Sequence, residues 1–136
     1  MKPLQYHQSS ILKEICERVS DISKNVYPEN RPTVLSEYIS DMVVVSFPTK
    51  IEDRHVYQTS DIRFEIMAKD RKNGIPDLEK LERMTNSLTA MFPMVAPRYV
   101  AQDPYLALKG QDHTGFTIWV LQADIIINTT DRYDLK

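Results

Sequence analysis

Few side chains in this sequence are of the types that usually carry chemistry, and those few stand apart. His7, His55 and His113 lie far from one another, each in a polar stretch. No two of them share a helix or strand at the spacing of metal ligands. The segment Asp112-His113-Thr114 sets an acid beside a base, but no activated nucleophile accompanies it. We therefore expect solvated loop histidines, no metal site and no catalytic set.

Glycine and cysteine are equally sparse. The glycines Gly74, Gly110 and Gly115 form neither a phosphate-binding loop nor a dinucleotide fingerprint, so we expect no cofactor. The single cysteine, Cys16, excludes an intrachain disulfide and removes any need for an oxidising compartment. It borders an apolar stripe with no histidine or basic partner beside it, which favours a packed thiol over a reactive one.

Charged and aromatic side chains indicate contacts rather than catalysis. Lys69, Arg71 and Lys72 form a small basic cluster at a predicted turn, where solvation is the simplest interpretation. Several tyrosines lie in long predicted connections, and such connections often serve a contact. Because arginine and tyrosine are enriched in protein interfaces, the candidate contact residues are Arg54, Tyr57, Arg71, Arg98, Tyr99, Tyr105 and His113.

Length and composition bound the class of protein. The 136 residues predict a single α+β domain, 1–136, with an ordered core over about 8–130. The 17 basic and 19 acidic residues give a net charge of -2, so no strong field exists to hold nucleic acid or an anionic membrane. The longest apolar-rich stretch, 116–127, is too short for a membrane helix. The polar N-terminus lacks the apolar region of a signal peptide, and we expect a cytoplasmic protein.

Two segments have the periodicity of amphipathic helices. Apolar residues recur at three- and four-residue steps over 8–26 and again over about 77–91. Ser9 or Ser10 is the expected cap of the first helix. The second is expected to begin at Pro76-Asp77, because proline suits a first turn and an acid there complements the helix dipole. The expected buried stripes are Ile11, Leu12, Ile15, Val19, Ile22 and Val26, and then Leu78, Leu81, Met84, Leu88 and Met91.

Two strands are expected between the helices. The β-branched run 43–47 is typical of a central strand, and the alternation over 60–69 is typical of a strand with one wet face. We expect them to pair antiparallel across a long polar connection, 50–59. The segment 33–40 fits helix, strand or coil and stays open.

Two more strands are expected after the second helix. Residues 95–101 fit a strand, which Pro97 would confine to an edge or a bulge. A polar connection, 102–114, then leads to a long strand, 115–129, whose Trp119 face is the more apolar. The predicted fold class is therefore α+β in the order α-β-β-α-β-β, an antiparallel four-stranded sheet with two helices packed on one face.

The order of these elements carries a resemblance. An amphipathic helix, 9–26, precedes a proline-containing link, and the strand Met42-Val43-Val44-Val45-Ser46-Phe47-Pro48 follows. A long hairpin leads to an alternating strand that ends in Ala68-Lys69-Asp70, a helix starts at Pro76-Asp77, and a last strand covers 116–129. This arrangement resembles the tail terminator proteins of long-tailed bacteriophages, also called tail completion or head–tail joining proteins. The similarity covers residues 8–130 and lies in element order rather than in an invariant motif.

The resemblance implies a structural protein without enzymatic activity. Family members assemble into rings, typically hexamers, on the end of the tail tube, stop its polymerisation and face the head connector. The implied partners are therefore copies of the chain itself, the tail tube protein and the head–tail connector protein. DNA would pass through the ring without sequence reading, no membrane is involved, and the protein would move from the host cytoplasm to the neck of the virion. The connections 50–59 and 102–114 are the expected projections that meet neighbouring subunits.

Two other classes stay open from the sequence. A small-molecule or peptide-binding α+β module unrelated to phages predicts a closed apolar pocket beneath the helices. An enzyme built from scattered loop residues predicts a convergent cluster around Asp112 and His113.

Overall fold

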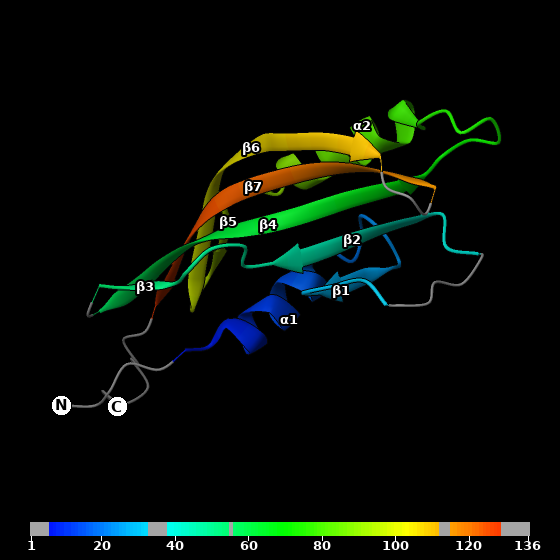
Figure 1. Cartoon of the computed structure of the whole chain (residues 1–136). Helices are drawn as coiled ribbons and strands as arrows, with labels where there is room; N and C mark the ends of the chain where they lie inside the picture. The colour runs from blue at the N-terminus through cyan, green and yellow to red at the C-terminus, as the bar shows by residue number, and fades with distance from the viewer. Residues whose placement is uncertain (1–5, 33–37, 55, 112–114, 129–136) are drawn as a thin grey trace.

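The computed structural model describes residues 6–32, 38–54, 56–111 and 115–128 (Figure 1). Strands dominate this part of the chain, and the sheet runs the whole length of the molecule. In chain order the elements are α1 (Gln8–Arg18), β1 (Val26–Pro28), β2 (Asp41–Ser46), β3 (Glu52–Asp53), β4 (Tyr57–Lys69), α2 (Leu78–Thr89), β5 (Met94–Ala96), β6 (Tyr99–Gln111) and β7 (Phe116–Asn128).

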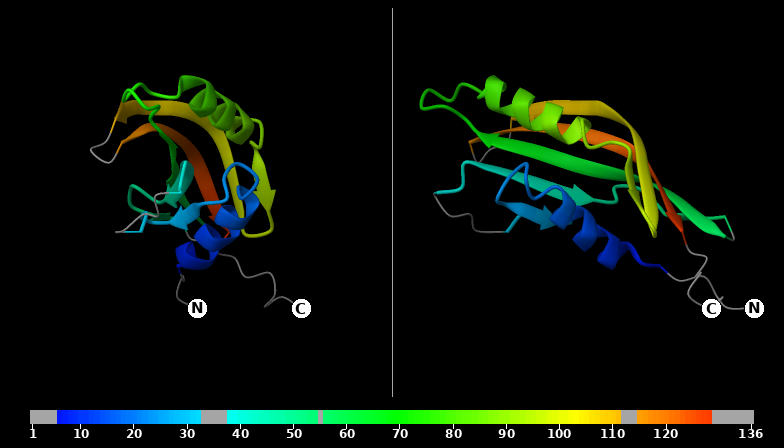
Figure 2. Two further views of the ribbon diagram at one scale, coloured as in Figure 1. Left: turned by 90° about the vertical axis from the view of Figure 1, so that its right-hand side faces the viewer. Right: turned by 180° about the vertical axis from the view of Figure 1, so that it is seen from behind.

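Within the described residues these strands form one curled, mixed sheet (Figure 2). Its order is β1-β2-β4-β7-β6-β5, with β3 added beside β4. β1 pairs parallel with β2, and the other pairings are antiparallel. The expected fold class is therefore wrong: seven strands replace the four-stranded antiparallel sheet. The expected antiparallel pairing of 43–47 with the alternating strand is confirmed as β2 on β4.

The first helix is shorter than its periodicity predicts. α1 ends at Arg18, and Val19 stays buried beyond it. Ser20 Oγ then donates to the carbonyl of Glu17 at 2.7 Å. Such side-chain bonds compete with helical backbone bonds and favour a turn. The chain therefore leaves the helix early, and Val26, expected in the helix, begins β1.

The expected polar connection 50–59 is mostly strand. β3 and the start of β4 form a hairpin, in which the Arg54 N–H donates to the Tyr57 carbonyl at 2.7 Å. Gln58 is fully buried there, and its Nε2 donates to Asp53 Oδ1 at 2.8 Å. Polar residues on the wet side of a half-exposed strand resemble loop composition, which explains the wrong prediction.

The expected polar connection 102–114 is likewise strand through Gln111. Pro104 is accommodated because the pairing with β7 shifts register between Gln102 and Tyr105, where Asp103 has a φ of 57°. An irregularity of this kind lets an edge strand carry a proline. No long arm extends from these two segments where the structure describes them, so the expected projecting connections are wrong.

Both helices pack on one face of the sheet (Figure 2). α2 begins as expected, with Asp77 as its cap, whose carboxylate accepts from the Lys80 N–H at 3.3 Å. Leu78 is an exception to its expected stripe, because it is exposed. The shared core contains Ile11, Leu12, Ile15, Val43, Val45, Ile62, Phe64, Ile66, Leu81, Met84, Leu88, Leu121, Ala123, Ile125 and Ile127, among others.

Among the residues that the structure describes, the opposite face of the sheet carries no helix. Its two halves differ in character. Towards the end of β4, a second cluster of Met42, Val44, Met67 and Phe116 is buried beneath Tyr27, Ile39 and Ile118. Towards the start of β4 the same face turns polar and remains open, with Asp61 and Asp124 on it. The open half is where this face can meet another molecule.

Candidate interaction surfaces

The candidate contact residues fall in separate parts of the molecule. Arg54, Tyr57 and Arg98 lie where the β3–β4 hairpin, the β5–β6 turn and the end of β7 meet. Arg54 Nη2 lies 2.6 Å from Glu52 Oε2. Tyr57 stands opposite Asn128 in the sheet, and the Asn128 N–H donates to the Arg98 carbonyl at 2.8 Å. The structure therefore brings these three candidates together at one end of the sheet.

The remaining candidates lie elsewhere. Arg71 belongs to the turn between β4 and α2, at the opposite end of the sheet. Tyr105 is an exposed residue of β6, and Gln122 Nε2 donates to its hydroxyl at 3.3 Å. His113 lies outside the described residues, as does His55, while His7 caps α1. The candidates do not form a single patch.

Tyr99 is a core residue, and its expected place at an interface is wrong. Only 1% of its surface is exposed. Arg18 at the end of α1 donates to its hydroxyl through Nη1 at 3.1 Å and to the Val95 carbonyl through Nη2 at 3.0 Å. Burial raises the pKa of the Tyr99 hydroxyl, and the Arg18 guanidinium opposes that effect. Tyr99 therefore serves to fasten α1 to the β5–β6 hairpin.

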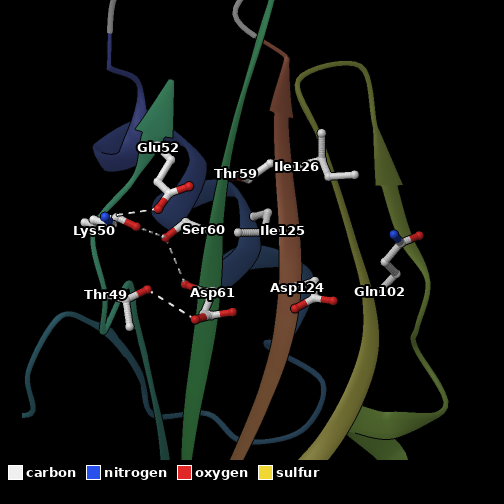
Figure 3. A pocket seen from close by; sticks show the side chains of 10 residues that line it. All are labelled: Thr49, Lys50, Glu52, Thr59, Ser60, Asp61, Gln102, Asp124, Ile125 and Ile126. Atoms are coloured by element: carbon white, nitrogen blue, oxygen red, sulfur yellow. Dashed lines mark hydrogen bonds and ion pairs between the residues drawn. The ribbon is translucent and has the colours of Figure 1, made fainter. Parts of the chain in front are cut away.

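A hollow lies on the open half of the helix-free face (Figure 3). It measures about 530 Å³ and lies over β3, β4, β7 and β6. Its floor is rigid strand, and its rim is tied down where Thr49 Oγ1 donates to Asp61 Oδ2 at 3.2 Å and Ser60 Oγ donates to the Lys50 carbonyl at 3.1 Å. We call it the acidic hollow; it is lined by Thr49, Lys50, Glu52, Thr59, Ser60, Asp61, Gln102, Asp124, Ile125 and Ile126.

Two carboxylates stand directly opposite each other in this hollow. Asp61 on β4 and Asp124 on β7 are register partners. Asp124 is in turn the register partner of Gln102 on β6. Glu52 is compensated by Lys50 at 3.1 Å and Arg54 at 2.6 Å. Neither aspartate has a cation at ion-pair distance among the residues that the structure describes. Like charges facing each other across two strands destabilise the pairing.

The turn between β4 and α2 projects beyond the sheet at the other end (Figure 1). We call residues 70–75 the basic turn, because Arg71 and Lys72 are both exposed on it. The Arg71 N–H donates to the Ile75 carbonyl and the Gly74 N–H to the Arg71 carbonyl, each at 2.8 Å. Gly74 has a φ of 73°, a left-handed conformation that glycine adopts without steric cost. The shape of the turn is therefore fixed.

Hydrogen bonds also join the basic turn to the β6–β7 hairpin. Thr117 Oγ1 donates to Asp70 Oδ1 at 2.6 Å, and the Asp70 N–H donates to the Gly115 carbonyl at 2.8 Å. Gln111 Nε2 reaches the carbonyl of Gly74 at 3.3 Å. These bonds hold the turn against the β6–β7 hairpin, so it projects as a fixed feature rather than a loose loop.

The described residues were also compared with what a metal site, a reactive thiol or a membrane-spanning helix requires. Across the described ranges, no group of three or more His, Cys, Asp or Glu side chains is placed to hold a metal ion. Burial raises the pKa of the Cys16 thiol to about 11, so it is protonated at neutral pH and a poor nucleophile. None of the helices in this part of the chain is both long and apolar enough to cross a membrane.

The acidic hollow was missed from the sequence, although part of its signal was visible. Alternation puts Asp61 on the wet face of one strand and Asp124 on the more polar face of another. Which residue of β7 stands opposite Asp61 depends on the register, and only the structure provides it.

Comparison of the chain with protein-family models and with curated proteins found no match. The surfaces described above are therefore interpreted from their own chemistry.

Proposed function

We propose that this chain is a structural subunit of the bacteriophage tail terminator type. Copies would assemble into a ring, a hexamer as in that family, on the end of a tail tube and meet the head connector. DNA would pass through the ring without sequence reading. The protein would be made in the host cytoplasm and end in the neck of the virion, and it would perform no catalysis.

The observation that carries this proposal is the distribution of exposed apolar side chains. Six of the ten large apolar side chains that are exposed on the described residues belong to segments at the two opposite ends of the long sheet, and exposed apolar groups are unfavourable in water. A closed ring requires each subunit to offer two different, complementary surfaces. Tyr6, Val56 and Tyr57 belong to the end that holds the β3–β4 hairpin, and Tyr38, Ile75 and Leu78 belong to the end that holds the basic turn and the start of α2.

At each end a side-chain hydrogen bond ties neighbouring segments together. Tyr6 Oη donates to Asp53 Oδ2 at 2.9 Å, which holds the chain before α1 against the β3–β4 hairpin. At the other end, Lys80 Nζ donates to Ser40 Oγ at 3.2 Å, which places the segment after Tyr38 beside the start of α2. Preformed surfaces lose little conformational entropy when they associate, which favours assembly.

The alternative function is a small-molecule or peptide-binding module, and the acidic hollow is the feature of the structure on which it can be judged. That class predicted a closed apolar pocket beneath the helices. The hollow instead lies on the helix-free face, open to solvent and lined by Glu52, Asp61 and Asp124. Binding pockets for small molecules are mostly apolar and enclose the ligand, so the hollow suits a protein surface better than a metabolite.

The test measures assembly directly. Sedimentation velocity and electron microscopy over a wide concentration range, with and without a tail tube protein, should show rings. Leu78→Ser should weaken assembly, whereas Glu82→Ser, an exposed polar position on the same helix, should not. A monomer under every condition, or a gene with no tail tube or tape-measure neighbours, would contradict the proposal.

A further inference from the structure

The facing aspartates of the acidic hollow are an unfavourable arrangement in a free subunit. Asp61 and Asp124 are register partners, and Lys50, which lines the same hollow, lies 3.1 Å from Glu52 instead. Two carboxylates held side by side attract a cation, and a guanidinium can hydrogen-bond carboxylates through several N–H donors at once. A cationic side chain docked between them would relieve the repulsion.

The same chain carries such side chains on the basic turn. Arg71 is 58% exposed, and its contacts with Asp77 at 3.4 Å and Glu79 at 3.9 Å are long. Exposed ion pairs of that kind contribute little to stability, so Arg71 can exchange them for better partners. Lys72 is exposed beside it, and Ile75 adds an apolar side chain.

We infer that the basic turn of one copy docks in the acidic hollow of the next, with Arg71 and Lys72 between Asp61 and Asp124. The inference rests on the proposed self-assembly and names the surfaces that make it. Ile75 beside the turn and Ile126 at the hollow, both partly or fully exposed in the single chain, supply apolar area to the same contact. The occupant of the hollow is therefore a second copy of this chain.

The contact must form between copies rather than within one. The hollow lies beside Asp61 near the start of β4, and the basic turn follows Lys69 at its end. Eight residues of strand separate these positions by roughly 26 Å at the rise of an extended chain. Because the surfaces differ and lie at opposite ends, the contact is head-to-tail, the kind that closes into a ring or continues as a filament.

Charge reversal tests the pairing. The hollow variant is Asp61→Lys with Asp124→Lys, and the turn variant is Arg71→Glu with Lys72→Glu. Each should weaken self-association at least about tenfold, because like charges are then juxtaposed at the contact. Matched controls carry the same change in charge on the helices: Glu17→Lys with Glu82→Lys for the hollow, and Lys13→Glu with Arg83→Glu for the turn. Neither control should weaken assembly.

Mixing the two variants is the decisive arm. In an equimolar mixture the reversed hollow of one variant meets the reversed turn of the other, and the two native surfaces also meet. Assembly should therefore return to near the wild-type level, and the oligomers should contain both variants in alternation. Misfolding cannot mimic this rescue, because a misfolded partner would not restore anything.

Cross-linking gives an independent readout. In a Cys16→Ser background, Lys72→Cys with Asp124→Cys should form a ladder of disulfide-linked oligomers under oxidation. Each single-cysteine variant should stop at dimers. Rings that form normally from both charge variants, with no rescue and no ladder, would overturn this inference and leave the proposed function standing. A wild-type chain that never associates, with or without tube protein, would overturn both.

Discussion

Lys80 Nζ lies 2.8 Å from Asp41 Oδ2, and this ion pair fastens α2 to the first residue of β2. Only 21% of each side chain is exposed. The same carboxylate accepts a short hydrogen bond from Ser23 Oγ, and the Asp41 carbonyl accepts from Asn25 Nδ2 at 3.1 Å. The start of β2, helix α2 and the segment between α1 and β1 thus meet at one acid, although Asp41 and Lys80 are far apart in the sequence.

Lys80→Met should lower the free energy of unfolding by about 1–3 kcal/mol, between the effects of breaking exposed and fully buried ion pairs. The loss arises because Asp41 is left partly buried without its cation. Urea denaturation at neutral pH measures it. Lys13→Met removes an exposed lysine from α1 and should change little; equal losses in the two variants would contradict the role of the pair.

The contribution of Asp41 should also depend on pH. Burial alone would raise the pKa of Asp41, but hydrogen bonds from Lys80, Ser23 and Ser40 and the charge of Lys80 outweigh it and lower that pKa. A lowered folded-state pKa stabilises the protein fully above the unfolded pKa of about 4, and the contribution disappears as the pH falls through the folded value. The stability gap between wild type and Asp41→Asn should therefore be constant near neutrality and narrow in acid. A gap that widens on acidification would refute the assignment.

Arg18→Ala should destabilise the chain by about 1 kcal/mol, the usual worth of a hydrogen bond between partly exposed groups. Arg18 joins α1 to Tyr99 and to the Val95 carbonyl, and its guanidinium lies 5.9 Å from the centre of the Tyr99 ring. Tyr99→Phe keeps the ring and removes the hydroxyl. A double-mutant cycle over Arg18→Ala and Tyr99→Phe should give a measurable coupling energy in chemical denaturation; strict additivity would show that the two residues do not act together.

Leu81 and Leu78 offer a matched pair on one helix. Leu81 is fully buried and Leu78 is 55% exposed. Leu81→Ala should cost about 2–5 kcal/mol of unfolding free energy, because it leaves a cavity in the core. Leu78→Ala should stay within about 0.5 kcal/mol in the monomer, as surface substitutions usually do. Thermal and urea unfolding measure the loss in each variant. A larger loss for Leu78→Ala than for Leu81→Ala would contradict the orientation of α2.

Elements with a long local pattern could be predicted from the sequence. α2 repeats its apolar residues over several turns and carries Asp77 at its start, and β4 alternates from Asp61 to Ile66. The short strands could not be predicted, because three residues carry no period. β1 is a strand because Val26 pairs with Val43, and β5 because Met94 pairs with Ala101.

Tyr99 shows why the sequence alone could not predict which candidate residues lie at the surface. In the sequence it stands between Pro97 and a polar stretch, which indicates a connection. In the structure a hairpin turn at Pro97 and Arg98 brings Tyr99 opposite Ile127, facing the core. The hollow likewise depends on which residues oppose one another across strands, and polarity alone does not specify that register.

The pairing of β4 with β7 extends unbroken from Tyr57 to Lys69. A force applied between the two ends of the sheet acts parallel to these strands, whereas the hydrogen bonds between the strands are perpendicular to it. Such a load stretches all the bonds in shear at once instead of opening them one after another. The chain should therefore resist stretching along the line that joins the two ends of the sheet.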